Sequence, residues 1–174
     1  MTEDEKRFND DVLFQEDEIL LARNMIDSLR TTMEFLYYLM DYKDKPSFTI
    51  IMISTDKLKL ETVLSKWKRS TDILLNIDPK KNIYAIVCQA TTSGGGRQFA
   101  KILLSNIHLH GGINTYCTAM EIKTTRYTIQ DVVFKLVDKY LSVKDKKQSN
   151  EIFFTKLELD SDDYRQDIIY NHQK

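Results

Sequence analysis

Apolar residues recur three and four positions apart between Glu16 and Tyr42, a spacing that predicts one amphipathic helix. The residues of this apolar stripe are Ile19, Ala22, Ile26, Leu29, Met33, Leu36 and Met40. The spacing also suits a coiled-coil seam, but the flanking positions lack the regular charges of one. We therefore expect the helix to pack on the protein's own sheet, with pairing to a second copy as the alternative.

Short apolar runs and further helical patterns alternate along the rest of the chain. The run 48–54 is apolar at nearly every position, which predicts a central strand covered on both faces. All the strands predicted in this way are 48–54, 73–77, 83–88, 115–124 and 152–155. The further helices are predicted at 60–67, 99–107 and 128–141, the last of them capped by Thr128.

This order of elements predicts an α+β fold. After the first helix it contains the βαββαβ sequence of a ferredoxin-like core, to which a helix and an edge strand are added. Such a sheet is mostly antiparallel and carries its helices on one face. We expect a flexible leader over 1–15, a single domain over 16–159 and an acidic tail over 160–174.

Composition and charge disfavour several classes of protein. Lysine and arginine total 25 against 26 aspartate and glutamate residues, so a strongly basic nucleic-acid binder is disfavoured. No apolar run approaches the length of a membrane span, and the polar N-terminus is not a signal peptide. Cys88 and Cys117 lie in apolar runs, as reduced thiols of a cytoplasmic protein do. The histidines lack metal-ligand spacing, so we expect no metal and no cofactor.

Two loops carry distinctive residues. Asp78 followed by Pro79 opens a type I turn, so the segment 78–82 is predicted to join two strands as a hairpin. The segment 91–96, which contains three consecutive glycines, is predicted to be a loop before the next helix. It lacks the lysine ending of a phosphate-binding loop.

Five short segments, taken in order, resemble the motifs of the GGDEF (diguanylate cyclase) family, whose fold is that of the nucleotide-cyclase palm. The resemblance covers roughly residues 17–155. Asp17 to Asn24 resembles the opening DxLTxLxN, and Ser54 to Lys59 the strand-end motif DxDxFK. The others are Arg69-Ser-Thr-Asp72 (RxxD), Val137-Asp138 with Leu141 (ADxAL) and Asn150 before the final strand.

The resemblance implies a site for metal-assisted joining of two GTP molecules, and this sequence departs from it. Ser54 stands at the first acidic position of the strand-end motif, and only Asp56 remains. The signature hairpin is replaced either by Asp78 to Asn82 or, with a two-residue insertion, by Lys80 to Tyr84. Both registers lack the glycine pair and the acidic pair. The vestigial metal and signature positions are Ser54, Asp56, Asp78, Lys80, Lys81 and Asn82.

The RxxD match implies a ligand site at Arg69 and Asp72, because this family motif binds cyclic di-GMP. The alternative is a solvated pair at a helix end. We therefore expect a catalytically inactive, bacterial GGDEF-like signalling domain that acts as a regulatory or interaction module. Its expected ligands are cyclic di-GMP or GTP, and a protein partner or a second copy is its expected macromolecular contact. The alternatives are a protein-interaction scaffold without a small ligand, and residual diguanylate cyclase activity.

Overall fold

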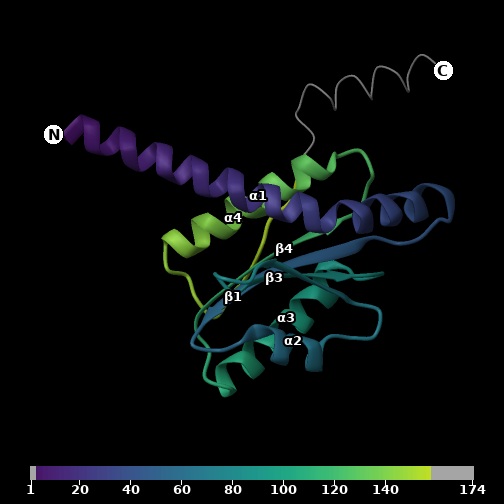
Figure 1. Cartoon of the computed structure of the whole chain (residues 1–174). Coiled ribbons are helices and arrows are strands. Elements are labelled where there is room, and N and C mark those ends of the chain that lie inside the picture. The colour runs from purple at the N-terminus through teal and green to yellow at the C-terminus, as the bar shows by residue number, and fades with distance from the viewer. Residues whose placement is uncertain (1–2, 158–174) are drawn as a thin grey trace, which may run out of the picture.

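The computed structural model describes the backbone of residues 3–157 and the side chains of residues 16–157. Helices and strands alternate along this part of the chain, except that β3 follows β2 directly (Figure 1). Their bounds are α1 Glu3–Tyr42, β1 Phe48–Asp56, α2 Leu60–Trp67, β2 Ile73–Asp78, β3 Ile83–Cys88, α3 Ser93–Leu109, β4 Ile113–Ile122, α4 Ile129–Asp145 and β5 Ile152–Phe154.

The strands form one sheet in the order β2-β3-β1-β4-β5. β1 lies at its centre and pairs antiparallel with β3 and with β4. β2 pairs antiparallel with β3, whereas β5 pairs parallel with β4. Every residue of β1 is buried except Asp56, so the predicted central strand is confirmed. The mixed α+β class and the mostly antiparallel sheet are confirmed as well.

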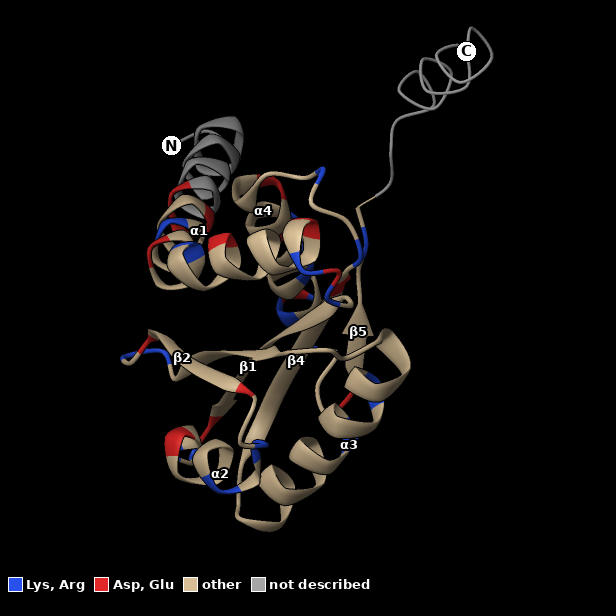
Figure 2. Cartoon of the chain, turned by 90° about the vertical axis from the view of Figure 1, so that its right-hand side faces the viewer, with Lys and Arg blue, Asp and Glu red and all other residues tan. Residues whose placement is uncertain are grey.

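Helices cover both faces of the sheet, and the prediction that they lie on one face was wrong (Figures 1 and 2). α1 and α4 pack on one face around Ile50 and Met52, and α2 and α3 pack on the other around Ile51 and Ile53. Successive residues of β1 are apolar, so side chains on both faces need cover from water. The second layer consists of α1 and of α4, the helix that was predicted as an addition to the ferredoxin-like core.

α1 packs on the protein's own sheet, as its apolar stripe predicts. Leu29 and Met33 are fully buried in the same cluster as Met52. Ile19, in contrast, is 58% exposed. The helix begins at Glu3 and not near Glu16, so it extends into the segment expected to be a leader. The expected acidic tail, 160–174, lies outside the described residues.

The glycine-rich segment is helical, which corrects the predicted loop over 91–96. α3 begins at Ser93, and the Thr92 hydroxyl accepts a hydrogen bond from the Gly95 N–H at 3.3 Å as its N-cap. A β-carbon at Gly96 would lie 3.0 Å from the Thr49 side chain, so close contact between α3 and β1 requires a small residue there. The cap of α4 by Thr128 is confirmed.

Candidate functional site

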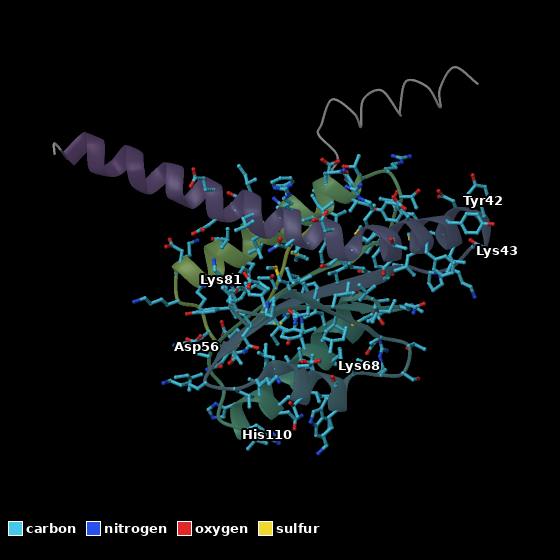
Figure 3. The ribbon with its side chains drawn as sticks, viewed as in Figure 1. Tyr42, Lys43, Asp56, Lys68, Lys81 and His110 are labelled. Carbon is cyan, nitrogen blue, oxygen red and sulfur yellow. The ribbon has the colours of Figure 1, made fainter. Side chains whose placement is uncertain are left out.

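The site residues predicted from the sequence fall into two groups at opposite ends of β2. Arg69 and Asp72 lie just before this strand, and Asp78 is its last residue. A strand of six residues spans about 20 Å, so the groups form separate sites. Figure 3 shows the same separation, with Asp56 and Lys81 at one end of the sheet and Lys68 at the other.

Arg69 and Asp72 bind each other. The Arg69 Nη2 lies 2.8 Å from the Asp72 Oδ1, and the Arg69 Nε donates to both carboxylate oxygens at 3.1 Å. The main-chain N–H of Arg69 also donates to the Asp72 Oδ2 at 2.8 Å. The carboxylate is therefore satisfied by charge-assisted bonds within one turn of the chain, between α2 and β2.

The two members of this pair differ in their access to solvent. The Asp72 side chain is 0% exposed and the Arg69 side chain is 48% exposed. The Arg69 guanidinium also donates to the Thr91 hydroxyl at 2.6 Å and lies 5.7 Å from the centre of the Phe99 ring. Its hydrogen bond to Asp72 raises the pKa of Arg69. In this arrangement a ligand has access to Arg69 and none to the Asp72 carboxylate.

Cys88 lies beside this pair, and its thiol is unreactive. Burial, followed by the negative charge of Asp72, raises the pKa of its thiol from 9.0 to about 12. The thiol is fully buried, and a protonated thiol is a poor nucleophile. The cluster around Arg69 thus contains an ion pair and hydrogen-bonding groups, with no activated nucleophile among these residues.

At the other end of the sheet, Ser54 is bound to α4. Its hydroxyl lies 2.6 Å from the Tyr140 hydroxyl, and both side chains are buried. Burial raises the pKa of Tyr140 to about 12, although the hydrogen bond from Ser54 opposes this shift. Ser54 therefore joins β1 to the helix above it, and its hydroxyl does not face solvent.

The residues at the end of β1 do not fit a divalent metal. Mg²⁺ is held by carboxylates and phosphates with near-octahedral geometry. Asp56 is the only carboxylate among the strand-end positions, and its Oδ2 accepts a hydrogen bond from the Asn114 amide at 3.1 Å. Among the described residues, no group of three or more His, Cys, Asp or Glu side chains could hold a metal ion.

The β2–β3 turn is organised by Asp78. Its Oδ1 accepts hydrogen bonds from the main-chain N–H groups of Lys80 and Lys81, at 3.0 and 3.1 Å. This bonding is typical of aspartate at the start of a turn, and it confirms the predicted hairpin. Both lysines are exposed. The turn thus presents two cations, where the resembled family would present glycines and carboxylates.

Asn82 ties this turn to the loop after β1. Its Nδ2 donates to the carbonyl oxygens of Thr55 at 2.8 Å and Leu58 at 2.6 Å. Its Oδ1 accepts from the Leu60 N–H at 3.3 Å, and its φ is +55°. Asparagine tolerates this left-handed conformation better than most residues. Asn82, which is the last signature position in the register Asp78 to Asn82, therefore has a structural role.

Segments that were matched separately in the sequence meet around one cavity of about 380 Å³. It lies between α1, the hairpin and the C-terminal part of α4, and it is lined by Asp17, Asn24, Asp78, Lys81, Tyr140 and Lys144, among others. No ion pair joins these charged side chains in the described part of the chain. The structure thus brings residues of the opening segment and of the hairpin to one cavity.

Two residues of these sites were missed by sequence reasoning. Tyr140 falls in the helix predicted at 128–141 but was not singled out there, and neither was Asn114. A tyrosine on an apolar helix face signals that its hydroxyl needs a hydrogen-bond partner, and the structure shows that this partner is Ser54. Asn114 has a positive φ of 51°, which no local pattern reveals.

No helix in the described residues is long and apolar enough to cross a membrane.

Comparison with known proteins shows a similar fold among solved structures. No family model matches the sequence. No curated protein matches it either. Among solved structures, the chain is similar to diguanylate cyclase SiaD from Pseudomonas aeruginosa, crystallised in complex with its activator SiaC. The TM-score is 0.58 at 12% sequence identity, and the match covers 88% of this chain and 71% of that one. At this identity the likeness shows the fold alone, which is similar to that of a diguanylate cyclase.

Proposed function

We propose that this chain is a GGDEF-like signalling module without cyclase activity, and that it works by binding a protein partner. The antiparallel order β2-β3-β1-β4, with α2 and α3 as crossover helices, supports a ferredoxin-like core. The SiaD structure contains an activator protein, which supports partner binding by a protein of similar fold. The observation that carries the proposal is an exposed aromatic stripe on α1.

The lack of cyclase activity is supported by what occupies the family's catalytic positions. Joining nucleotides needs neutralisation of triphosphate charge, normally by a carboxylate-held metal. Ser54 is engaged with Tyr140, and Asn82 is engaged with main-chain groups. Asp56 is left as a lone exposed carboxylate. These residues provide neither a metal site nor a flexible glycine turn for close approach of a nucleotide.

The α1 aromatic stripe consists of Phe35, Tyr38 and Tyr42. These side chains are 59%, 50% and 73% exposed, and their spacing of three and four places them on one face of the helix. The rings of Tyr38 and Tyr42 lie 4.9 Å apart. Exposed aromatic residues gathered on one face are typical of the energetic centre of a protein interface.

The interaction is tested by placing a photo-crosslinking amino acid at Tyr38, with a label at Ile102 as the control. Ile102 is 50% exposed but lies on α3, in the opposite layer. The partner captured from Tyr38 is then purified and its affinity measured. Phe35→Glu should weaken it at least tenfold, and Ile102→Glu should change it less than twofold. Adducts only between copies of this chain, or equal adducts from both labels, would overturn the proposal.

The choice of Phe35 matters because the sequence suggested other positions. Leu29 and Leu36 belong to the apolar stripe that would face a second copy if the helix paired externally. Both are buried in the core, with exposed fractions of 0% and 6%. A charge at either would unfold the domain and report nothing about binding.

A nucleotide receptor is a second candidate, favoured by the exposed Arg69 guanidinium beside Phe99. A cation and an aromatic ring together suit a phosphate and a base. Calorimetric titration with cyclic di-GMP and with GTP tests it. Binding that is lost in Arg69→Ala and kept in Lys68→Ala would establish the receptor, and absence of heat would reject it.

Cyclase activity is tested directly with GTP and Mg²⁺ or Mn²⁺. We expect no cyclic di-GMP above the level of a no-protein control. Sustained turnover that disappears in Asp56→Ala would refute the inactive assignment. This assay is independent of the crosslinking experiment, so the two halves of the proposal can fail separately.

A further inference from the structure

A cavity lies beyond the carboxyl ends of β4 and β5, which are paired in parallel from Cys117 to Ala119 of β4. α3 precedes β4 and packs on one face of the sheet, whereas α4 follows β4 and packs on the other face. Ligands of sheets with parallel strands bind in the crevice outside the carboxyl ends of the strands, where the connections change face. The position of this cavity is therefore typical of a site for a small molecule.

The cavity is large enough for such a ligand, and its walls are mainly apolar. Its volume is about 600 Å³, and pockets that bind small ligands measure about 300–1,000 Å³. Met120, Ile122 and Leu157 line it and pack with the core cluster under α1 and α4. Phe154 lines it from the cluster on the other face of the sheet. A ligand here lies against apolar side chains from both layers.

One main-chain N–H group is open at this edge of β4. The carbonyl oxygen of Ala119, on the outer side of the strand, accepts a hydrogen bond from the Thr155 N–H at 2.9 Å. Alternate residues of a strand direct their main-chain groups to the same side. Glu121, which lines the cavity two residues after Ala119, therefore directs its N–H outward as well. The pairing of β4 with β5 ends at Ala119, so no described strand accepts a hydrogen bond from this group.

Arg97 brings a positive charge to the cavity. Its guanidinium lies 4.9 Å from the centre of the Phe154 ring, and it forms no ion pair with a described carboxylate. Among the other charged lining residues, Lys123 lies 3.7 Å from the Glu121 carboxylate and offsets its charge. Lys156 adds a further positive charge to the lining. The described lining is therefore net positive, which favours an anionic ligand.

Arg97 and the Glu121 N–H lie at the same place along the sheet. A β-carbon at Gly96 would lie 3.0 Å from the Thr49 side chain, so the start of α3 packs directly on Thr49. Thr49 is the register partner of Glu121 in the pairing of β1 with β4. Arg97 follows Gly96, and both Arg97 and Glu121 line the cavity. The two donors can therefore converge on one anionic group.

We propose that this cavity binds an amphipathic monocarboxylate, a small molecule with one carboxylate and an apolar chain. The carboxylate accepts hydrogen bonds from the Arg97 guanidinium and from the Glu121 N–H, and charge-assisted bonds of this kind are strong. The apolar chain packs against Met120, Ile122 and Leu157, where it is removed from water. This site is separate from the α1 aromatic stripe and from Arg69, so it adds a ligand to the proposed partner binding.

Octanoate, with 1-octanol as its uncharged match, tests the proposal. Each probe is titrated into the isotope-labelled full chain, at concentrations below those at which octanoate forms micelles, and the amide signals are followed by NMR. We expect octanoate to shift the amides of Met120 to Lys123 and of Leu157, and to bind at least tenfold more tightly than 1-octanol. The proposal is wrong if these amides do not shift, if the shifts centre on Tyr38, or if both probes bind equally.

Two pairs of variants test the recognition of the carboxylate. Arg97→Ala removes a charge-assisted hydrogen bond and should weaken octanoate binding at least tenfold. Lys101→Ala removes the same charge from an exposed position of α3 outside the cavity, and should change the affinity less than twofold. Ser93→Glu places a carboxylate in the lining and should weaken binding, whereas Gln98→Glu adds it to an exposed position outside. Equal effects within each pair would assign the binding to overall charge and refute the site.

Discussion

Replacing Asn82 with alanine removes three hydrogen bonds and puts an ordinary side chain at a φ of +55°. The lost bonds connect the β2–β3 turn to the carbonyl groups of Thr55 and Leu58 and to the N–H of Leu60. Thr55 and Leu60 are buried, so water replaces these bonds poorly. We expect Asn82→Ala to lower the free energy of unfolding without changing the fold.

The magnitude follows from two contributions. A hydrogen bond contributes a net of about 0.5–1.5 kcal/mol to the free energy of unfolding. One of these three is long, at 3.3 Å, so we take their sum in the lower half of the range, at about 2 kcal/mol. A left-handed conformation costs an alanine about 1 kcal/mol more than an asparagine. Asn82→Ala should therefore cost about 3 kcal/mol. Asn82→Gly keeps the left-handed backbone accessible, so it should cost about 2 kcal/mol through the hydrogen bonds.

Urea unfolding monitored by circular dichroism measures these values. Lys81→Ala is the matched control, because its exposed side chain is next in the same turn and it should change stability by less than about 0.5 kcal/mol. For a chain of this length, about 3 kcal/mol corresponds to a fall in Tm of about 6–12 °C. If Asn82→Ala and Lys81→Ala unfold at the same urea concentration, the structural role assigned to Asn82 is refuted.

Three further changes have defined outcomes. The pKa of Tyr140 is about 12 in the folded protein against its ordinary 10.0, because the side chain is buried. The stability that the fold keeps by holding this hydroxyl neutral is therefore complete below pH 10 and is lost as the pH rises toward 12. Urea unfolding over this pH range should show that the free energy of unfolding falls by up to about 1.4 kcal/mol per pH unit because of this group. Tyr140→Phe should lack this part of the decline, and an identical decline in both chains contradicts the prediction. Gly112→Ala would place a β-carbon 2.5 Å from Ile107 Cγ2 and 3.0 Å from the Ile107 carbonyl oxygen. It should cost about 1–3 kcal/mol in urea unfolding, and a neutral result would show that the neighbours move freely. Arg69→Ala leaves the Asp72 carboxylate buried without its cation, and since Arg69 is half exposed we expect a loss of about 1–3 kcal/mol by the same measurement; unchanged stability would count against the ion pair.

The sheet and its helices could be predicted because the hydrophobic pattern reports burial directly. β1 is apolar at successive positions, and a strand covered on both faces requires this. The same fact implied helices on both faces, but the ferredoxin-like analogy led to the opposite prediction. The pattern was the better guide, because the apolar residues on each face of β1 must be covered whatever the family.

The candidate sites were less predictable, because their contacts join segments distant in sequence. Asp78 was recognised as a turn residue, since its partners are two and three residues away. Asn82 was not recognised as a structural residue, because its partners lie more than twenty residues earlier. The start of α3 was missed because three glycines disfavour a helix locally, while contact with Thr49 requires a small residue there.

α1 extends far beyond the buried part by which it packs on the domain. Its 40 residues make a rod of about 60 Å (Figure 1). Among the side chains of α1 that the structure describes, the buried ones lie between Leu21 and Leu36. The part before Leu21 is about 27 Å long, so a tilt of about 10° at the domain moves the Glu3 end by about 5 Å. α1 packs against α4 and the sheet, which carry Tyr140 and Ser54. A displacement of the Glu3 end therefore applies a torque to this packing.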